Sequence, residues 1–258
     1  MSFSNNTDVL WQQIRAEALA PLEQEPLLTP LMLSAIVDRH SLPEALAHRL
    51  AHRLAAADFP AAPLLDLFSR LLTDHPDIVG ALASDINAVL ERDPAVHQAS
   101  EVLLYMKGVH ALTTHRFAHA LWKQRRHHLA RYLQHRSSEV FQTDIHPAAC
   151  LGCGIFVDHA TGVVIGETAV IEDDVTLLHS VTLGGTGAHT GDRHPKVRRG
   201  AFIGADAKLL GNIEIGEAAR IGAGSVVLTE IPPHATAVGI PAKIVSRDTG
   251  DTPHHSGR

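Results

Sequence analysis

Apolar residues recur at every sixth position through the second half of this chain. The series is Ile145, Leu151, Val157, Ile165, Ile171, Leu177, Leu183, Ile203, Leu209, Ile215, Ile221 and Val227. Neither an amphipathic helix nor an alternating strand has this period. A six-residue repeat is typical of a parallel β-helix, in which each repeat forms one side of a coil and buries its apolar residue against neighbouring coils. We therefore predict such a coil for residues 141–245.

The six-residue pattern is interrupted twice. The first gap, after Val157, contains two extra residues, and the second spans the twenty residues from Leu183 to Ile203, enough to extrude a loop. Three regular sides and the two extra residues make one coil twenty residues long. His159 should therefore lie directly beside His179, at the ~4.8 Å spacing of neighbouring strands.

The first 140 residues have helical periodicity instead. Thr29 before Pro30 predicts a helix N-cap, and Ser41-Leu42-Pro43-Glu44 predicts a capping box. Apolar residues then recur at three- and four-residue spacing as far as residue 133. Because no flexible linker precedes the coil, we predict an α+β chain whose all-helical domain, residues 1–140, packs directly on the first coil. Residues 246–258 should form a flexible polar tail.

Composition narrows the class of protein. The net charge of −6 gives no field that favours nucleic acid or an anionic membrane. We found no signal-like segment and no apolar run that could span a bilayer. Two cysteines do not imply a disulfide framework. A soluble, cytoplasmic protein is the expectation.

Two pairs of residues invite a metal-site hypothesis. Cys150 and Cys153 form a lone C-x-x-C, but both should face outward on the coil and no second pair exists. His115 and His119 share a helix face, but no glutamate lies between them and no third ligand is evident. We interpret the first pair as incidental thiols and the second as ordinary helix residues, and predict no metal.

Polar residues gather beside the two interruptions. Asp158-His159 follows the first, and Asp144 lies on the coil below. A histidine with carboxylates nearby can act as a general base, because a carboxylate fixes its tautomer and stabilises the imidazolium. The run Gly184-Gly185-Thr186-Gly187 either forms the hinge of the extruded loop or brings backbone N–H groups close to an oxyanion or phosphate.

The extruded segment is locally basic. Arg193, Lys196, Arg198 and Arg199 surround His194 in an otherwise acidic chain. Such a run is often a solvated surface. Its place after a glycine turn favours a carboxylate or phosphate ligand.

Several motifs together resemble one family. They are Asp93-Pro94-Ala95, Lys107-Gly108-Val109-His110-Ala111-Leu112, Asp158-His159-Ala160-Thr161-Gly162, Gly166-Glu167-Thr168-Ala169, His179-Ser180-Val181-Thr182-Leu183-Gly184-Gly185-Thr186-Gly187 and Gly191-Asp192-Arg193-His194-Pro195-Lys196. Over residues 10–245 the chain closely resembles bacterial serine O-acetyltransferases, which are hexapeptide-repeat acyltransferases. The resemblance implies a left-handed β-helix, a homotrimer or a hexamer built as a dimer of trimers, and acetyl transfer from acetyl-CoA to L-serine in a ternary complex. It also implies feedback inhibition by L-cysteine.

The resemblance also assigns roles. His159 would be the general base and Asp144 would orient it. Asp93 and Asp158 would hold the substrate ammonium, although Asp93 before Pro94 would otherwise be interpreted as a helix N-cap. The substrate carboxylate would be met, from the neighbouring subunit, by Arg193 and His194. The acetyl-CoA groove would be lined by Gly185, Ala205, Arg220, Ala223 and Lys243.

The chain departs from the family pattern at two positions, and three alternative functions stay open. Arg220 stands where the family often has lysine, which keeps the charge but alters the geometry. Many members end in an isoleucine that docks into O-acetylserine sulfhydrylase, so Arg258 argues against that complex. The alternatives are a hexapeptide acyltransferase for a sugar, a zinc enzyme of the γ-carbonic anhydrase kind using His159, His179 and His194, and an inactive scaffold. Asp93 discriminates against the sugar, which has no ammonium.

Overall fold

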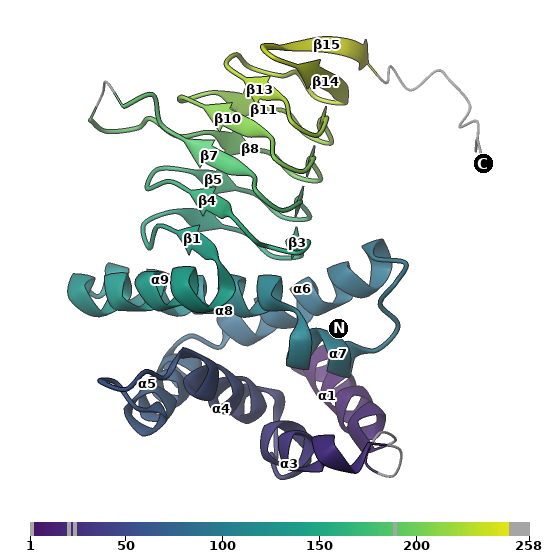
Figure 1. Ribbon diagram of the computed structural model, residues 1–258, viewed down its shortest axis with the longest axis vertical. Coiled ribbons are helices and arrows are strands. Elements are labelled where there is room, and N and C mark those ends of the chain that lie inside the picture. Colours follow the sequence, from purple (N-terminus) through teal and green to yellow (C-terminus); the bar gives the residue numbers. More distant parts are fainter. Residues whose placement is uncertain (1–2, 20–21, 23–24, 188–189, 248–258) are drawn as a thin grey trace.

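The molecule has a layer of helices at its N-terminal end and a stack of short strands above it (Figure 1). The computed structural model describes residues 3–19, 22, 25–187 and 190–247. The predictions about the C-terminal tail beyond Arg247, including the role of Arg258, lie outside these residues. No helix within the described ranges is long and apolar enough to cross a membrane.

Helices fill the chain up to Phe141. Ser41 caps α4, where its side chain accepts a hydrogen bond from the backbone of Glu44, as predicted. Thr29 does not act as the predicted cap, because it lies inside α3. The helical elements are α1 (Phe3–Leu19), η1 (Pro26–Leu28), α3 (Thr29–Met32), η2 (Leu33–Val37), α4 (Leu42–Leu54), α5 (Ala61–Asp74), α6 (Asp77–Arg92), α7 (Ala99–Tyr105), α8 (Lys107–Lys123) and α9 (His127–Phe141).

The helical layer has its own core of large side chains. Phe68 of α5 stacks on Phe117 of α8 with ring centroids 4.5 Å apart, and both are fully buried. A buried ion pair between Asp85 of α6 and Arg116 of α8 connects this layer to the coil above. Arg116 also donates to the carbonyl oxygen of Gly152, and Asp85 accepts from the backbone of Ile155. The helices therefore pack directly on the first coil.

The strands form three sheets that wind upward as a parallel β-helix. Their orders are β1-β4-β7-β10-β13 in the first sheet, β2-β5-β8-β11 in the second, and β3-β6-β9-β12-β14-β15 in the third. The strands are β1 (Thr143–Ile145), β2 (Cys150–Leu151), β3 (Phe156–Val157), β4 (Val163–Ile165), β5 (Val170–Ile171), β6 (Thr176–Leu177), β7 (Thr182–Gly184), β8 (Lys196–Val197), β9 (Phe202–Ile203), β10 (Lys208–Leu210), β11 (Glu214–Ile215), β12 (Arg220–Ile221), β13 (Val226–Val227), β14 (Ala235–Gly239) and β15 (Ala242–Arg247).

The six-residue series forms the core of the coil. Its members stack in three columns, one for each sheet, and the column of the first sheet is Ile145, Ile165, Leu183, Leu209 and Val227. The second sheet contains a member that the sequence series omitted, Val197, which pairs with Ile171. The extruded loop is therefore confined to the connection between β7 and β8 and does not extend to Ile203.

The ends of the coil differ slightly from the expected boundaries. The last helix ends at Phe141 and the first strand begins at Thr143. At the other end, β14 and β15 form an antiparallel hairpin on the last coil, and β15 continues to Arg247. Ser246 and Arg247 therefore belong to a strand rather than to the expected tail.

Candidate active site

Four of the residues named from the sequence lie in a single column at one corner of the coil. Strand pairing places Val157, Leu177, Ile203 and Ile221 in register. The residues two positions further along therefore also lie one above another, and we call them the corner column: His159, His179, Ala205 and Ala223. The ring centroids of His159 and His179 are 5.8 Å apart, which confirms the predicted adjacency.

The two extra residues after Val157 give this corner an unusual backbone. His159 and Ala160 both have left-handed conformations, with φ of 54° and 56°. Single left-handed residues also occur at regular corners of the coil, such as Ser180 and Asp206, whereas here two follow one another. The turn is held from both sides, because Lys107 donates to the Thr161 hydroxyl and Thr143 donates to the carbonyl oxygen of Ala160.

The His159 side chain projects into solvent from this turn. It is 73% exposed, and its Nε2 lies 3.5 Å from Oδ2 of Asp158. Asp144 lies on β1 and accepts a hydrogen bond of 2.7 Å from the Gln134 side chain. The turn therefore presents an accessible imidazole next to a carboxylate, while the pairing of His159 with Asp144 stays a prediction.

A cavity of about 640 Å³ opens on the outer face of the third sheet beside this corner. Asp93 and Asp158, the two carboxylates expected to share an ammonium, both line it, and so does Arg220. The remaining lining residues are Arg92, Pro94, Phe156, Asp174, Thr176, Leu178, Gly200 and Phe202. The fold thus brings together residues that are far apart in the sequence.

Asp93 enters the cavity from the helical layer. It ends α6 as the C-cap, so its interpretation as a helix N-cap is wrong. Its Oδ1 accepts a hydrogen bond of 2.9 Å from the backbone of Ala95, which fixes the direction of the carboxylate. Arg220 enters from β12 and lies over the ring of Phe202, with Cζ 4.7 Å from the centroid. With Asp174 and Arg92, three carboxylates and two guanidiniums thus line the cavity.

The next corner, between the first and second sheets, holds Arg193 and His194. Arg193 donates to Glu167 at 2.7 Å, and this hydrogen bond lowers the pKa of the Glu167 carboxyl. The His194 ring fills the space beside Gly166, where an added Cβ would lie 1.9 Å from the ring. Only glycine at position 166 leaves room for this histidine.

Thr168 fixes the orientation of His194. Its hydroxyl oxygen accepts from the backbone N–H groups of Arg193 and His194 at 3.0 and 3.1 Å and lies 2.9 Å from Nδ1 of His194. The Thr168 backbone donates to this nitrogen. Nδ1 is therefore an acceptor, and Nε2 carries the proton of the neutral ring. Burial, helped by Arg193, lowers the pKa of His194.

The basic residues of the loop are neutralised by nearby carboxylates. Lys196 pairs with Asp192. Arg198 pairs with Glu172 and Glu214, and Arg199 with Asp173 and Asp174. Arg193 is paired in the same way, with Glu167. The carboxylate or phosphate ligand expected for this basic segment therefore stays a prediction.

The other cofactor candidates lie at both corners. Gly185 follows β7, and an added Cβ there would come within 3.2 Å of the Arg193 side chain. Lys243 lies on β15 opposite Val238, whose side chain in turn packs against Gly222 beside the corner column. Residues 188 and 189 of the loop lie outside the described ranges.

The predicted site residues therefore fall into two groups within one chain. Asp158 and His159 lie between the third and first sheets, beside the cavity that Asp93 lines from the helical layer, whereas Arg193 and His194 lie between the first and second. The first sheet separates the groups. The same separation divides the three histidines of the zinc hypothesis, and no group of three or more metal-binding side chains occurs within the described residues.

Sequence reasoning gave no role to Gly166, Glu167 or Thr168. They appeared only as part of a motif, although their contacts position both Arg193 and His194. A glycine directly after the buried Ile165, followed by a carboxylate and a hydroxyl, was the available signal. Its partner lies 26 residues further on, across the extruded loop, so the contact could not be read from spacing.

Comparisons with known proteins identify the family. A model described as the N-terminal part of serine acetyltransferase matches residues 10–114, and one for bacterial transferase hexapeptide repeats matches residues 194–229. The serine acetyltransferase of Haemophilus influenzae is 52% identical, with 95% of this chain and 91% of that protein covered. That of Escherichia coli K12 is 50% identical, covering 95% and 90%.

Solved structures agree. Serine acetyltransferase of Brucella abortus in complex with coenzyme A is 51% identical with a TM-score of 0.92, covering 94% of this chain and 97% of that one. The soybean enzyme complexed with serine is 49% identical with a TM-score of 0.91, covering 93% and 99%. A serine acetyltransferase in complex with cysteine is 52% identical with a TM-score of 0.92, covering 95% of both chains. These matches confirm the expected left-handed β-helix, and the chain belongs to the serine acetyltransferase family.

Proposed function

We propose that this protein transfers the acetyl group of acetyl-CoA to the hydroxyl of L-serine, giving O-acetyl-L-serine and CoA. One observation carries the proposal. The accessible imidazole of His159 lies 3.5 Å from Asp158, which lines one cavity together with Asp93, and His159 is in the same column as Ala205 and Ala223. A base, a binding site for an ammonium and a groove for a cofactor are thereby adjacent.

His159 acts as the general base in this proposal. It takes the proton of the serine hydroxyl as the hydroxyl oxygen attacks the thioester carbonyl carbon. The tetrahedral intermediate collapses with cleavage of the carbon–sulfur bond, and the imidazolium returns its proton to the leaving thiolate. Asp144 orients the ring and stabilises its charged form. His159 is accessible on a held backbone, which suits a base that must meet a substrate.

Two carboxylates of the cavity, Asp93 and Asp158, bind the substrate ammonium. Asp93 comes from the helical layer with a fixed direction, and Asp158 comes from the coil. An ammonium between two carboxylates is a strong, charge-assisted arrangement. A sugar hydroxyl substrate has no group that would compensate these charges, so the arrangement favours an amino acid.

The substrate carboxylate is bound by Arg193 and His194 of a neighbouring subunit. Within one chain these residues lie on the other side of the first sheet from His159. A ring of three chains that places the second corner of one chain against the first corner of the next would complete the site. We therefore propose a homotrimer as the active unit, which the helical layers can join into a hexamer.

Acetyl-CoA lies along the corner column in this assembly. The small side chains of Ala205 and Ala223 leave room for an extended ligand, and the stacked coils bring them close, because Gly224 donates to the carbonyl oxygen of Ala205 at 2.8 Å. Lys243 and Arg220 supply positive charge near the same corner. Gly185 approaches from the neighbouring subunit.

L-cysteine is the expected inhibitor, because it has the same ammonium and carboxylate as serine. A relative solved with cysteine and another solved with serine support this part of the proposal. The cytoplasmic location expected from the sequence remains a prediction. Binding to O-acetylserine sulfhydrylase through the C-terminus is not part of the proposal.

Thiol release from acetyl-CoA tests the reaction, measured with L-serine and then with other hydroxyl acceptors, including a sugar. We expect turnover with serine and a loss of serine affinity in Asp93→Ala. If Asp93→Ala kept the serine affinity while His159→Ala abolished turnover, the amino-acid substrate would be wrong. Stoichiometric zinc in elemental analysis would favour the metalloenzyme instead.

A further inference from the structure

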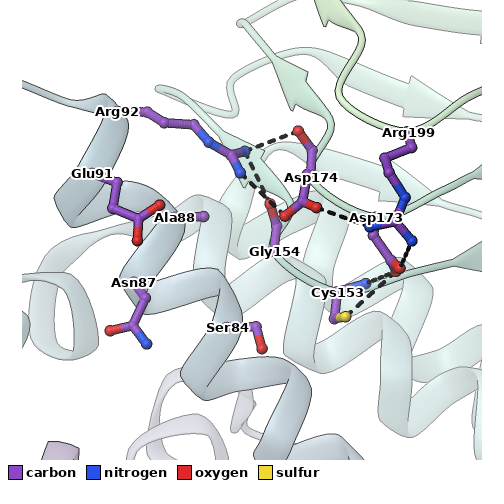
Figure 2. Close-up of a pocket in the computed structure, with 10 residues that line it drawn as sticks. All are labelled: Ser84, Asn87, Ala88, Glu91, Arg92, Cys153, Gly154, Asp173, Asp174 and Arg199. Carbon is purple, nitrogen blue, oxygen red and sulfur yellow. Dashed lines mark hydrogen bonds and ion pairs between the residues drawn. The ribbon is translucent and has the colours of Figure 1, made fainter. Parts of the chain in front are cut away.

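The side chain of Arg92 ties the end of α6 to the first two coils. Arg92 is the residue directly before Asp93. Its Nη1 donates to the carbonyl oxygens of Gly154 and Asp174 at 3.0 and 3.1 Å and lies 3.4 Å from the Thr176 hydroxyl. Its Nη2 pairs with the Asp174 carboxylate at 3.3 Å. Figure 2 shows the guanidinium reaching from the helix across to Gly154 and Asp174.

Arg92 and Asp174 also lie at the boundary of two neighbouring cavities. One is the cavity of Asp93 and Asp158. The other, of about 260 Å³, lies at the junction of α6 with the coil (Figure 2). Arg92 and Asp174 line both. The arginine therefore lines the cavity of the proposed ammonium site and is the residue next to Asp93.

The coil is shaped to receive this contact. Gly154 has a φ of 66°, and an added Cβ would lie 2.5 Å from Oδ1 of Asp174. That oxygen is the one that Arg92 binds. A glycine is required here both for the left-handed backbone and for the close approach of the carboxylate.

The attachment of the helical layer does not depend on Arg92. The buried pair of Asp85 and Arg116 holds the middle of α6 to the coil, with Ile155 and Gly152 as further partners. The two attachments have different consequences. The buried pair fixes the helix, whereas Arg92 fixes only its last turn and the residue that follows.

We propose that Arg92 is a positioning residue for the ammonium site. It holds the end of α6 so that the Asp93 carboxylate lies in the same cavity as Asp158. Without it, the last turn of the helix loses its attachment to the coil, and Asp93 samples other positions. His159 and its turn are held by Lys107 and Thr143, so the base stays in place. The proposal rests on the proposed function for the identity of the ligand only.

Steady-state kinetics of Arg92→Ala test this role. We expect the KM for L-serine to rise about tenfold while kcat stays within about twofold and the KM for acetyl-CoA is unchanged. Arg92→Lys, which keeps one donor and the charge, should recover part of the serine affinity. The matched control is Arg199→Ala, because Arg199 pairs with the same Asp174 but its hydrogen-bond acceptors among the described residues, Glu172, Asp173 and Asp174, all lie on the coil. It should leave the KM for serine within about twofold of the unmodified value.

Three kinetic outcomes would overturn the positioning role: an unchanged KM for serine in Arg92→Ala, an equal effect in Arg199→Ala, or a parallel loss of affinity for both substrates. A crystal structure of the Arg92→Ala protein without substrate tests the same positioning role. Displacement of the segment 93–95 away from Asp158 supports it, and an unchanged position overturns it. Failure of the unmodified protein to acetylate serine would refute the proposed function. The crystal structure of the Arg92→Ala protein would still decide whether Arg92 positions Asp93.

Discussion

The helical layer and the coil of this protein solve the problem of burial in different ways. The helical layer interlocks large side chains such as Phe68, Phe117 and Phe141, and it buries charged and polar groups, among them Asp85 and His110. The coil stacks isoleucine, leucine and valine in columns and places its ion pairs on the outside. A fully buried ion pair needs a specific partner, whereas a column needs only the correct period. The helical layer therefore depends on individual contacts and the coil on repetition.

The two regions also contribute differently to the proposed chemistry. The coil provides His159, Asp158, Arg193 and His194 at two of its corners, where the repeat is interrupted. The helical layer contributes one carboxylate, Asp93, at the end of α6. Regular coils provide a scaffold that many functions share, and the irregular corners give it a specific site.

The largest expected effect is at the irregular corner. His159→Ala should lower kcat by about 10²–10⁴, because it removes a positioned proton acceptor. It should leave the thermal midpoint unchanged, since the side chain is mostly exposed. Thiol release and thermal unfolding measure the two quantities. His179→Ala, one coil higher in the same column, is the control and should retain most activity. A decrease in kcat of less than about tenfold in His159→Ala would show that His159 is not the general base.

The regular part of the coil should respond locally. Leu209→Ala, inside β10, should cost about 2–5 kcal/mol of unfolding free energy, as Leu50→Ala should in α4, because both side chains are fully buried. Loss of hydrogen-exchange protection should stay in the upper coils for Leu209→Ala, because each coil contacts only its neighbours. For Leu50→Ala it should spread through the helices. If both variants lost hydrogen-exchange protection equally throughout the chain, the coil and the helical layer would not differ in how they respond to a lost core side chain.

Gly166 should affect serine kinetics because it leaves space for the ring of His194. Gly166→Ala should reduce kcat/KM for serine by about 10- to 100-fold, because the new methyl group would occupy the place of the His194 ring. The Gly166→Ala protein with unchanged serine kinetics would show that the position of His194 is irrelevant.

The last prediction concerns the stability of the helical layer in acid. Burial lowers the pKa of both His110 and His115 from 6.5 to about 3. The unfolded chain therefore binds more protons than the folded one below pH 6.5. Stability should fall by about 1.4 kcal/mol per pH unit for each histidine between pH 6.5 and 3.

Urea unfolding measures this loss. Comparing about pH 7 with about pH 5, the helical circular-dichroism signal should show the lower midpoint at the acidic pH. The carboxylates on the coil that have lowered pKa values, such as Glu172, begin to lose stability only nearer their ordinary pKa of 4.5. A midpoint that does not change over this range would show that the two histidines are not held neutral by the fold.

The coil could be predicted from the sequence almost residue by residue. Once the period is known, register follows from counting, and even the contact between His159 and His179 follows from a coil of twenty residues. Val197 was missed because the extruded loop interrupts the count before it. The capping box at Ser41 was equally local, and it was correct.

The arrangement of the helices could not be predicted in this way. Amphipathic periodicity locates a helix but does not say which face meets which partner, so the pairing of Asp85 with Arg116 and the reach of Arg92 to Asp174 had no signal in the sequence. Asp93 was named through a family resemblance only. The ion pairs of Arg198 and Arg199 had no signal in the sequence either, because their carboxylate partners lie on neighbouring coils.

The most direct test of the central claim, that one active site uses two corners from two chains, is a mixing experiment. His159→Ala and Arg193→Ala each remove one half of the site, and each protein alone should be nearly inactive. Co-expressed in equal amounts, they should recover about a quarter of the unmodified activity, because about a quarter of the interfaces then pair an intact first corner with an intact second corner. Mixed oligomers with no more activity than the separate variants would contradict the claim.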